Sequence, residues 1–157
     1  NIAAIHLVPK ETRLTLEELT KQKVYHRNQR NDWGTPPELF AQLHEEFHFT
    51  LDVAASPSNA LCHQYYSILD DALTQPWEGV VWCNPPYGHT VIDWVAKAYT
   101  SAQSGATVVC LLRATPDTRW WHRYTPYAEV RFIPGRLRFV GAKNAAPFPS
   151  CLIIFRP

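Results

Sequence analysis

The chain has 157 residues, of which 46% are hydrophobic, 18% charged and 13% aromatic. This length can bury the core of one domain and is too short for two. No run of about 18 apolar residues occurs, which excludes a membrane-spanning helix, and the net charge of +1 by itself indicates no particular partner.

The charges are unevenly distributed. Residues 1–30 carry six Lys and Arg against three Asp and Glu, residues 31–112 one Lys against nine acids, and residues 113–157 eight basic residues against two acids. An acidic centre between basic ends suits a protein that holds a cationic cofactor in one region and a polyanion in another. Chance segregation of solvated charges is the alternative.

The cysteines indicate a reducing compartment. Cys62, Cys83, Cys110 and Cys151 form no Cys-x-x-Cys pair, and three of them lie in or beside apolar runs. We interpret them as buried, reduced thiols. The N-terminus lacks the charged and then apolar pattern of a signal peptide, so we expect a cytoplasmic protein.

Residues 1–31 are predicted to be a basic N-terminal arm or docking helix. A capping box at 15–18 would start a helix that extends to Lys23. The surrounding residues are polar and basic, with a thin apolar stripe. Residues 32–157 are predicted to form one domain.

From residue 33 onward, helical and extended patterns alternate. Strands that alternate with helices and then follow one another indicate an α/β fold, a doubly wound sheet with an antiparallel edge. Pro134-Gly135 would join two of the last strands in a hairpin. The expected helices span 35–47, 59–66, 93–101 and 117–124, and the expected strands 49–53, 80–83, 107–112, 129–133, 136–140 and 151–155.

Asn84-Pro85-Pro86-Tyr87 directly follows the expected strand 80–83. In a doubly wound sheet this position lies beyond the carboxyl ends of the strands, where reactive sites form. The prolines fix φ on consecutive residues and favour an extended Asn84. The Asn84 side-chain oxygen and the Pro85 carbonyl can then accept hydrogen bonds from an amino group, and Tyr87 offers a ring on which a planar substrate can stack.

Two such acceptors suit an amine that is a poor nucleophile, such as N6 of adenine, whose lone pair is delocalised into the ring. They favour a tetrahedral nitrogen and stabilise the positive charge that develops during attack on a sulfonium methyl group. A proline-rich turn without a catalytic role is the alternative.

Further motifs accompany this tetrapeptide along most of the chain. They are Trp33-Gly34-Thr35-Pro36, Leu51-Asp52-Val53-Ala54-Ala55, Asp71-Ala72-Leu73, Asp117-Thr118-Arg119-Trp120-Trp121, Gly135-Arg136-Leu137-Arg138-Phe139 and Ala146-Pro147-Phe148-Pro149-Ser150.

From about Asp32 to Phe155 the chain resembles the phage-type DNA N6-adenine methyltransferases, whose signature is Asp/Asn-Pro-Pro-Tyr. The resemblance implies a Rossmann-like methyltransferase sheet, S-adenosylmethionine as the cofactor, double-stranded DNA as the partner, and a bacterial or phage-infected cell as the location. It implies that Asn84, Pro85, Pro86 and Tyr87 are catalytic. Only 31 residues separate Asp52 from Asn84, so we expect no separate target-recognition domain.

The resemblance also assigns residues to the cofactor. They would hold its methionine end, its ammonium group and its adenine amine. A short acid beside small residues at a strand end also provides room and charge for a ligand amine. The sequence lacks the Gly-x-Gly turn and an obvious acid for the ribose, and has Arg113 where the family pattern leads us to expect proline. The assigned residues are Trp33, Thr35 and Pro36, then Asp52 with Ala54 and Ala55, and finally Asp71.

The basic C-terminal third interleaves arginines with aromatic residues. Arginines can contact phosphates, and rings can stack on an extruded base. Alternation at 136–139 predicts that two arginines share one face of a strand. A solvated sheet face over core aromatics is the alternative. The candidate DNA-binding residues are Arg113, Arg119, Arg136, Arg138 and Phe148, and Arg131 belongs to the same interleaved set.

His44-Glu45-Glu46-Phe47-His48 matches the His-Glu-x-x-His pattern of zinc proteases. Both histidines would lie near the apolar side of a helix, and no convincing third ligand follows. We therefore interpret the segment as the helix before the first strand and expect no metal.

Other functions stay open at this point. An RNA-adenine or protein-glutamine N-methyltransferase would use the same tetrapeptide. A catalytically dead DNA-binding relative would keep the fold, although the presence of Asp52, Asn84 and Tyr87 argues against it. A zinc hydrolase is the weakest alternative.

Overall fold

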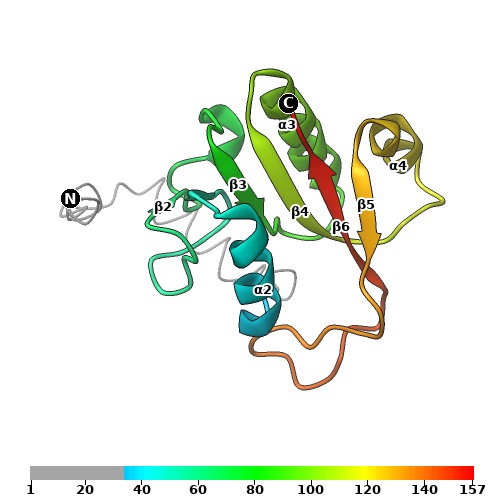
Figure 1. Cartoon of the computed structure of the whole chain (residues 1–157). Coiled ribbons are helices and arrows are strands. Elements are labelled where there is room, and N and C mark those ends of the chain that lie inside the picture. The colour runs from blue at the N-terminus through cyan, green and yellow to red at the C-terminus, as the bar shows by residue number, and fades with distance from the viewer. Residues whose placement is uncertain (1–33) are drawn as a thin grey trace.

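The computed structural model describes residues 34–157, so the predicted arm at 1–31 and Trp33 lie outside the described residues. The centre of the fold is a six-stranded sheet in the order β2-β1-β3-β4-β6-β5, with helices packed on it (Figure 1). The described part is therefore a mixed α/β domain, as the sequence predicts. None of the helices within 34–157 combines the length and apolar composition needed to cross a bilayer.

The elements follow one another in the order that the sequence pattern predicts, with two exceptions described below. The strands are β1 (Leu51–Asp52), β2 (Gln64–Tyr65), β3 (Val80–Cys83), β4 (Thr107–Arg113), β5 (Glu129–Phe132) and β6 (Ser150–Phe155). The α-helices are α2 (Pro37–Phe47), α3 (Val91–Gln103) and α4 (Arg119–Tyr124), and the 3-10 helices are η3 (Ala72–Thr74) and η4 (Thr125–Tyr127).

Strands β1 to β4 run parallel to one another. β6 pairs antiparallel with β4 along its whole length, from Val108↔Phe155 to Arg113↔Ser150, and β5 pairs antiparallel with β6. Every residue of β6 is buried, whereas β5 is exposed at both of its ends. A strand buried in this way needs a neighbour on each side. The antiparallel strand therefore lies one position inside the edge, and the edge strand β5 runs parallel to β4.

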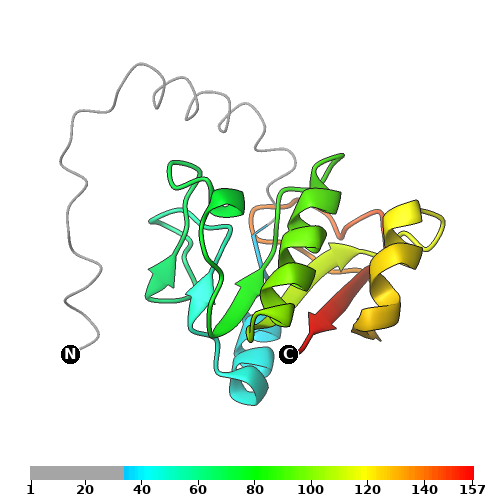
Figure 2. The ribbon, with the colours of Figure 1, turned by 90° about the horizontal axis from the view of Figure 1, so that it is seen from above.

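Side chains of the central strands alternate between two hydrophobic cores. On one face, Val108 and Cys110 of β4 pack with α3 and α4. On the other face, Val109 and Leu111 pack with α2 and with the segment 133–149, which connects β5 to β6. Figure 1 and Figure 2 together show α2 on one side of the sheet and α3 and α4 on the other.

The helix expected at 59–66 is wrong, because this stretch contains a turn followed by β2. The Tyr66 N–H donates to the Asp52 carbonyl oxygen at 2.9 Å, and the Ala55 N–H donates to the Tyr66 carbonyl oxygen at 3.0 Å. Hydrogen bonds that a helix would make internally are made instead with β1 and the turn after it.

The strand expected at 136–140 is also wrong, although one isolated bridge forms there. The chain turns back on itself, so that the Ala146 N–H donates to the Leu137 carbonyl oxygen at 2.7 Å. Among the described strands β5 pairs with β6 alone, and 136–140 forms no ladder on its outer edge. Arg136 and Arg138 are exposed, as expected, but they do not share the face of a strand.

Candidate active site at the carboxyl edge of the sheet

The parallel strands β1, β3 and β4 end side by side at one edge of the sheet, the lower edge in Figure 1. Asp52 ends β1, Asn84 follows β3, and Arg113 ends β4. Asp52 pairs with Trp82, two residues before Asn84. The fold thus brings the residues predicted for cofactor binding and for catalysis onto neighbouring strands.

The carboxylate of Asp52 is buried, with 3% of the residue exposed. Its Oδ1 accepts a hydrogen bond from the Ala54 N–H at 3.3 Å, and its Oδ2 accepts one from the Leu61 N–H at 3.1 Å. Within 34–157 no cationic side chain forms an ion pair with it. Two backbone dipoles therefore hold a buried negative charge that no described cation balances.

Burial raises the pKa of Asp52 from 3.8 to about 6, and the hydrogen bonds from Leu61 and Ala54 partly oppose this shift. Burial, with a smaller contribution from the Asp52 charge, also raises the pKa of the neighbouring Cys62 thiol to about 12. A cationic group that entered this site would favour the charged form of Asp52 and lower its pKa. The electrostatics of the site therefore suit a ligand amine.

Most of the other residues predicted to bind the cofactor lie near the same edge. Ala54 and Ala55 form the turn directly after Asp52. Pro36 precedes α2 and is half-buried. Asp71 is exposed at the start of η3 and takes a left-handed φ of 53°. That conformation is uncommon for a residue with a Cβ and often marks functional positions. These roles stay predictions.

The side chain of Asn84 is held by a residue far away in the sequence. Its Nδ2 donates to Thr35 Oγ1 at 3.1 Å, and Trp82 Nε1 donates to the same oxygen at 3.3 Å. Because the amide nitrogen faces Thr35, the amide oxygen Oδ1 is directed away from it. Pro85 is buried and Pro86 half-buried, so the chain leaves β3 through a tightly packed segment.

Tyr87 is anchored in the core. Its hydroxyl donates to the Leu111 carbonyl oxygen at 3.3 Å. Its ring packs edge-on against Phe148, with ring centroids 5.6 Å apart, and against Phe139, at 6.1 Å. Burial raises the pKa of this hydroxyl, which keeps it protonated. Stacking of Tyr87 on a planar substrate stays a prediction.

The arginines predicted to contact DNA gather around this edge. Arg113 is exposed, and its guanidinium carbon lies 5.1 Å from the centroid of the Phe148 ring. Arg119 begins α4 after the loop that leaves β4. Arg136 and Arg138 lie in the segment 133–149, which starts and ends at this edge. Phe148 itself is only 6% exposed, so its stacking on a base stays a prediction that this packing does not favour.

Among the described residues, Arg131 differs from Arg113, Arg119, Arg136 and Arg138 because it forms ion pairs. Its guanidinium donates to both carboxylate oxygens of Glu46, at 2.7 and 2.8 Å, and to Glu129 at 3.1 and 3.2 Å. Arg156 donates to Glu129 at 3.0 Å, and both guanidinium groups lie over the Phe47 ring. The hydrogen bonds from Arg131 lower the pKa of Glu46 and Glu129. Part of the basic charge is therefore used within the fold, and Arg131 is not a free phosphate ligand.

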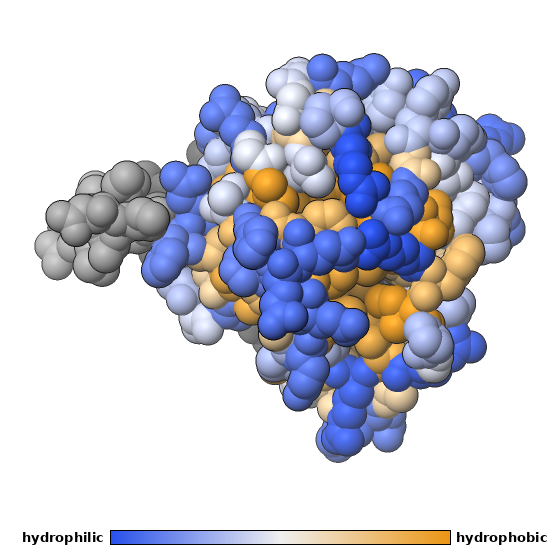
Figure 3. Space-filling view, in the orientation of Figure 1, coloured by the Kyte–Doolittle hydropathy of each residue, from blue (hydrophilic) through white to orange (hydrophobic). Residues whose placement is uncertain are grey.

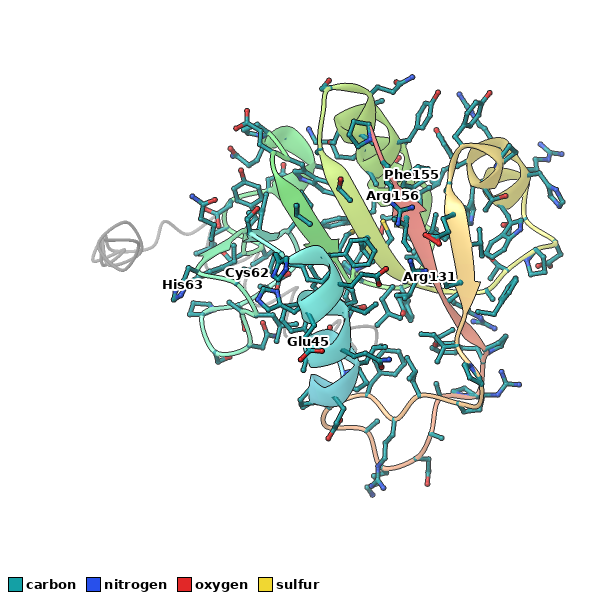
Figure 4. The ribbon with its side chains drawn as sticks, viewed as in Figure 1. Glu45, Cys62, His63, Arg131, Phe155 and Arg156 are labelled. Carbon is teal, nitrogen blue, oxygen red and sulfur yellow. The ribbon has the colours of Figure 1, made fainter. Side chains whose placement is uncertain are left out.

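Figure 3 shows hydrophilic side chains crossing an otherwise hydrophobic area between α2 and β5, and Figure 4 places Arg131 and Arg156 there. This ion-pair cluster joins α2 to β5 and β6 on the face opposite α3 and α4.

Residues 44–47 of the His-Glu-x-x-His segment end α2, the helix before β1, and His48 follows as its C-cap with a left-handed φ of 57°. His44 Nδ1 accepts a hydrogen bond from the Phe49 N–H at 3.1 Å, and its ring stacks on Phe40. Glu46 is engaged with Arg131. In the described part of the chain, no cluster of three or more His, Cys, Asp or Glu could hold a metal ion. The motif is used for packing.

Sequence reasoning missed the residues that hold the tetrapeptide in place. Phe139 is 1% exposed and packs on Tyr87. Gly34 forms an isolated bridge with Val140, and a Cβ on Gly34 would lie 2.9 Å from the Val140 Cβ. The glycine in Trp-Gly-Thr-Pro was a signal of this close approach.

Comparisons with known proteins agree with the geometry. A family model described as DNA N-6-adenine-methyltransferase (Dam) matches residues 22–157. A DNA N-6-adenine-methyltransferase of Escherichia phage T1 is 35% identical over 95 residues, which cover 59% of this chain and 40% of the relative. One of Haemophilus phage HP1 is 28% identical over 136 residues, 80% of this chain and 78% of the relative. The chain thus spans less than half of the first relative and most of the second.

The raised pKa of Asp52 predicts that the ligand-free protein becomes less stable as the pH rises. Between pH 4 and pH 6 the folded state binds more protons than the unfolded state, so the free energy of unfolding falls by about 2 kcal/mol across this range. Asp52→Asn removes this dependence. Urea denaturation of both proteins from pH 4 to pH 7 measures it, because the other titrating groups cancel in the difference. A difference that is constant with pH would contradict the prediction.

Proposed function

Because the chain belongs to the DNA N-6-adenine-methyltransferase family, we propose that it transfers a methyl group from S-adenosylmethionine to N6 of adenine in double-stranded DNA. One observation carries the assignment of the site. The Asn84 amide is held at the carboxyl edge of the sheet, one strand away from the buried Asp52 carboxylate. An acceptor for an amine substrate would then lie beside an acceptor for an amine of the cofactor.

The residues present fit S-adenosylmethionine. The Asp52 carboxylate is buried and receives only backbone hydrogen bonds among the described residues, so it has acceptor capacity and charge for the ammonium group. Ala54 and Ala55 leave space beside it. Asp71, which is exposed directly before η3, would accept from the adenine amine. The sheet with helices on both faces supports a Rossmann-like, doubly wound interpretation of the fold.

The cofactor supplies a sulfonium methyl group when it is bound. Asn84 Oδ1 and the Pro85 carbonyl would accept hydrogen bonds from the two N6 hydrogens of the target adenine. N6 then becomes more tetrahedral and its lone pair more available. As N6 gains the methyl group and positive charge, the same oxygens stabilise that charge until one N6 proton leaves to solvent. Both acceptors therefore act mainly in the transition state.

The DNA would lie along the carboxyl edge. Arg113, Arg119, Arg136 and Arg138 are exposed there and would contact phosphates. The half-buried, ion-paired Arg131 would not. The target adenine has to leave the base stack to reach Asn84, and the phosphate contacts would hold the strand on either side of it.

The first prediction tests the reaction. Asn84→Ala should lower kcat for DNA methylation by about 10²-fold or more, while S-adenosylmethionine still binds, because one preorganised acceptor is lost. Asn84→Asp keeps an acceptor oxygen and should retain more activity. Transfer of a labelled methyl group to DNA, RNA and protein, measured in parallel, checks both points. Labelling of RNA or protein alone by the wild type would overturn the proposed substrate, and full activity of Asn84→Ala would overturn the role of Asn84.

The second prediction concerns the cofactor. Because an ammonium group needs the charged form of Asp52, whose pKa is about 6, S-adenosylmethionine should bind about tenfold more weakly at pH 5 than at pH 7. Asp52→Asn should weaken binding at pH 7 by about 10- to 150-fold and remove the pH dependence.

Calorimetric titration from pH 5 to pH 8 measures both effects. Asp71→Asn is the matched control, because it removes another proposed cofactor contact and keeps Asp52. It should weaken binding and preserve the pH profile. A flat profile in the wild type would count against Asp52 as the ammonium site.

The third prediction concerns DNA. If phosphate contacts supply most of the affinity, log K should fall linearly with log salt, by about 0.9 per phosphate neutralised. Arg136→Gln with Arg138→Gln should lower this slope by up to about two and leave the preference between two unrelated duplexes unchanged.

Lys97→Gln with Arg156→Gln is the control, since it removes the same charge from α3 and from the opposite end of β6. It should leave the slope nearly unchanged. An unaltered slope with a changed preference in the Arg136 and Arg138 variant would mean that these arginines read bases.

A further inference from the structure

The Thr35 hydroxyl accepts hydrogen bonds from Trp82 and Asn84, and cofactor binding alone does not explain these contacts. We infer that Thr35 is a positioning residue whose hydroxyl sets the orientation of the Asn84 side chain for methyl transfer. The inference rests on the proposed role of Asn84 and assigns to Thr35 a different task from the one that the sequence suggests.

The position of the Thr35 oxygen is determined by the core. Trp82 is fully buried, and its indole N–H, which can only donate, points at Thr35 Oγ1. The Asn84 amide nitrogen donates to the same oxygen. Both acceptor positions of the hydroxyl are then occupied. The planar amide of Asn84 is thereby oriented, with its nitrogen on Thr35 and its oxygen turned away.

Thr35 is itself held in place by the chain on its N-terminal side. The Val140 N–H donates to the Gly34 carbonyl oxygen at 2.9 Å. The two backbones approach so closely that a Cβ on Gly34 would lie 2.9 Å from the Val140 Cβ. Figure 1 shows the start of α2 beside the segment 133–149. The same segment supplies the rings that pack on Tyr87, so it supports both ends of the tetrapeptide.

The partners of the Thr35 hydroxyl separate this role from cofactor binding. Among the described residues, its oxygen contacts Trp82 and Asn84. A residue that acts through Asn84 changes the rate of the chemical step, whereas a cofactor ligand changes the affinity for the cofactor.

Thr35→Val keeps the shape of the side chain and removes the hydroxyl. We expect kcat for DNA methylation to fall by about 10- to 100-fold, the scale of misplacing one reacting group, while Kd for S-adenosylmethionine changes by less than about threefold. Thr35→Ser restores the hydroxyl and should recover most of the lost turnover. Thr50→Val is the matched control, because Thr50 also places a hydroxyl on β3, at the opposite end of the strand. Its kcat should match the wild type.

A measurement that needs no activity keeps this inference separate from the proposed function. In ¹⁵N NMR spectra, Thr35→Val should shift the Asn84 side-chain amide signal, identified by its loss in Asn84→Ala, and one indole signal. Thr50→Val should shift neither. If the wild type methylates no DNA, the proposed function fails while this result can still stand. An unmoved Asn84 signal, or a loss of cofactor affinity with kcat unchanged, would overturn the positioning role.

A second variant tests the support of Thr35 without touching its hydroxyl. Gly34→Ala forces the Ala Cβ against Val140 and should lower kcat. Adding Val140→Gly removes the opposing Cβ, and because Val140 is 58% exposed, it costs little packing. The double variant should regain kcat. Wild-type kcat in Gly34→Ala, or no recovery in the double variant, would contradict the inference.

Discussion

The pairing of β4 with β6 is the interaction on which the rest of the domain depends. Both strands lie in the centre of the sheet and contribute to both hydrophobic cores. Because β6 is antiparallel, it begins at the carboxyl edge, where β5 ends. The connection between them, 133–149, must therefore stay at that edge. There it covers one face of the sheet, packs on Tyr87 and presents Arg136 and Arg138 to solvent. The antiparallel direction of β6 therefore brings much of the candidate site together.

Charged side chains have different partners in two parts of the domain. On the face between α2 and β5, Arg131 donates hydrogen bonds to Glu46 and Glu129, and these contacts join the two elements. At the carboxyl edge, Asp52 is buried with backbone partners alone among the described residues. A buried charge without a counterion destabilises the ligand-free fold. A cationic ligand would relieve that cost, so the same group that weakens the protein alone would strengthen its binding to the cofactor.

Catalytic orientation in this fold depends on residues that never touch the substrate. A weakly nucleophilic amine requires an acceptor at a defined angle, and a free asparagine side chain would sample several. Here Trp82 positions Thr35, and Thr35 positions Asn84. The bridge between Gly34 and Val140 holds the backbone next to Thr35 in place. The segment 133–149, which carries the exposed Arg136 and Arg138, thus also supports the Asn84 side chain.

The sequence by itself determined most of the element order, the buried strands and the location of Asp52 and Asn84 at the ends of neighbouring strands, because apolar runs report burial and parallel strands bring their carboxyl ends to one edge. It did not determine which strand lies beside which, so the strand at 136–140 and the helix at 59–66 were wrong. Periodicity reports whether a residue is buried and not what it is buried against. The hydrogen bond between Thr35 and Asn84 joins residues 49 positions apart, and such a contact exists only once the sheet and α2 have packed.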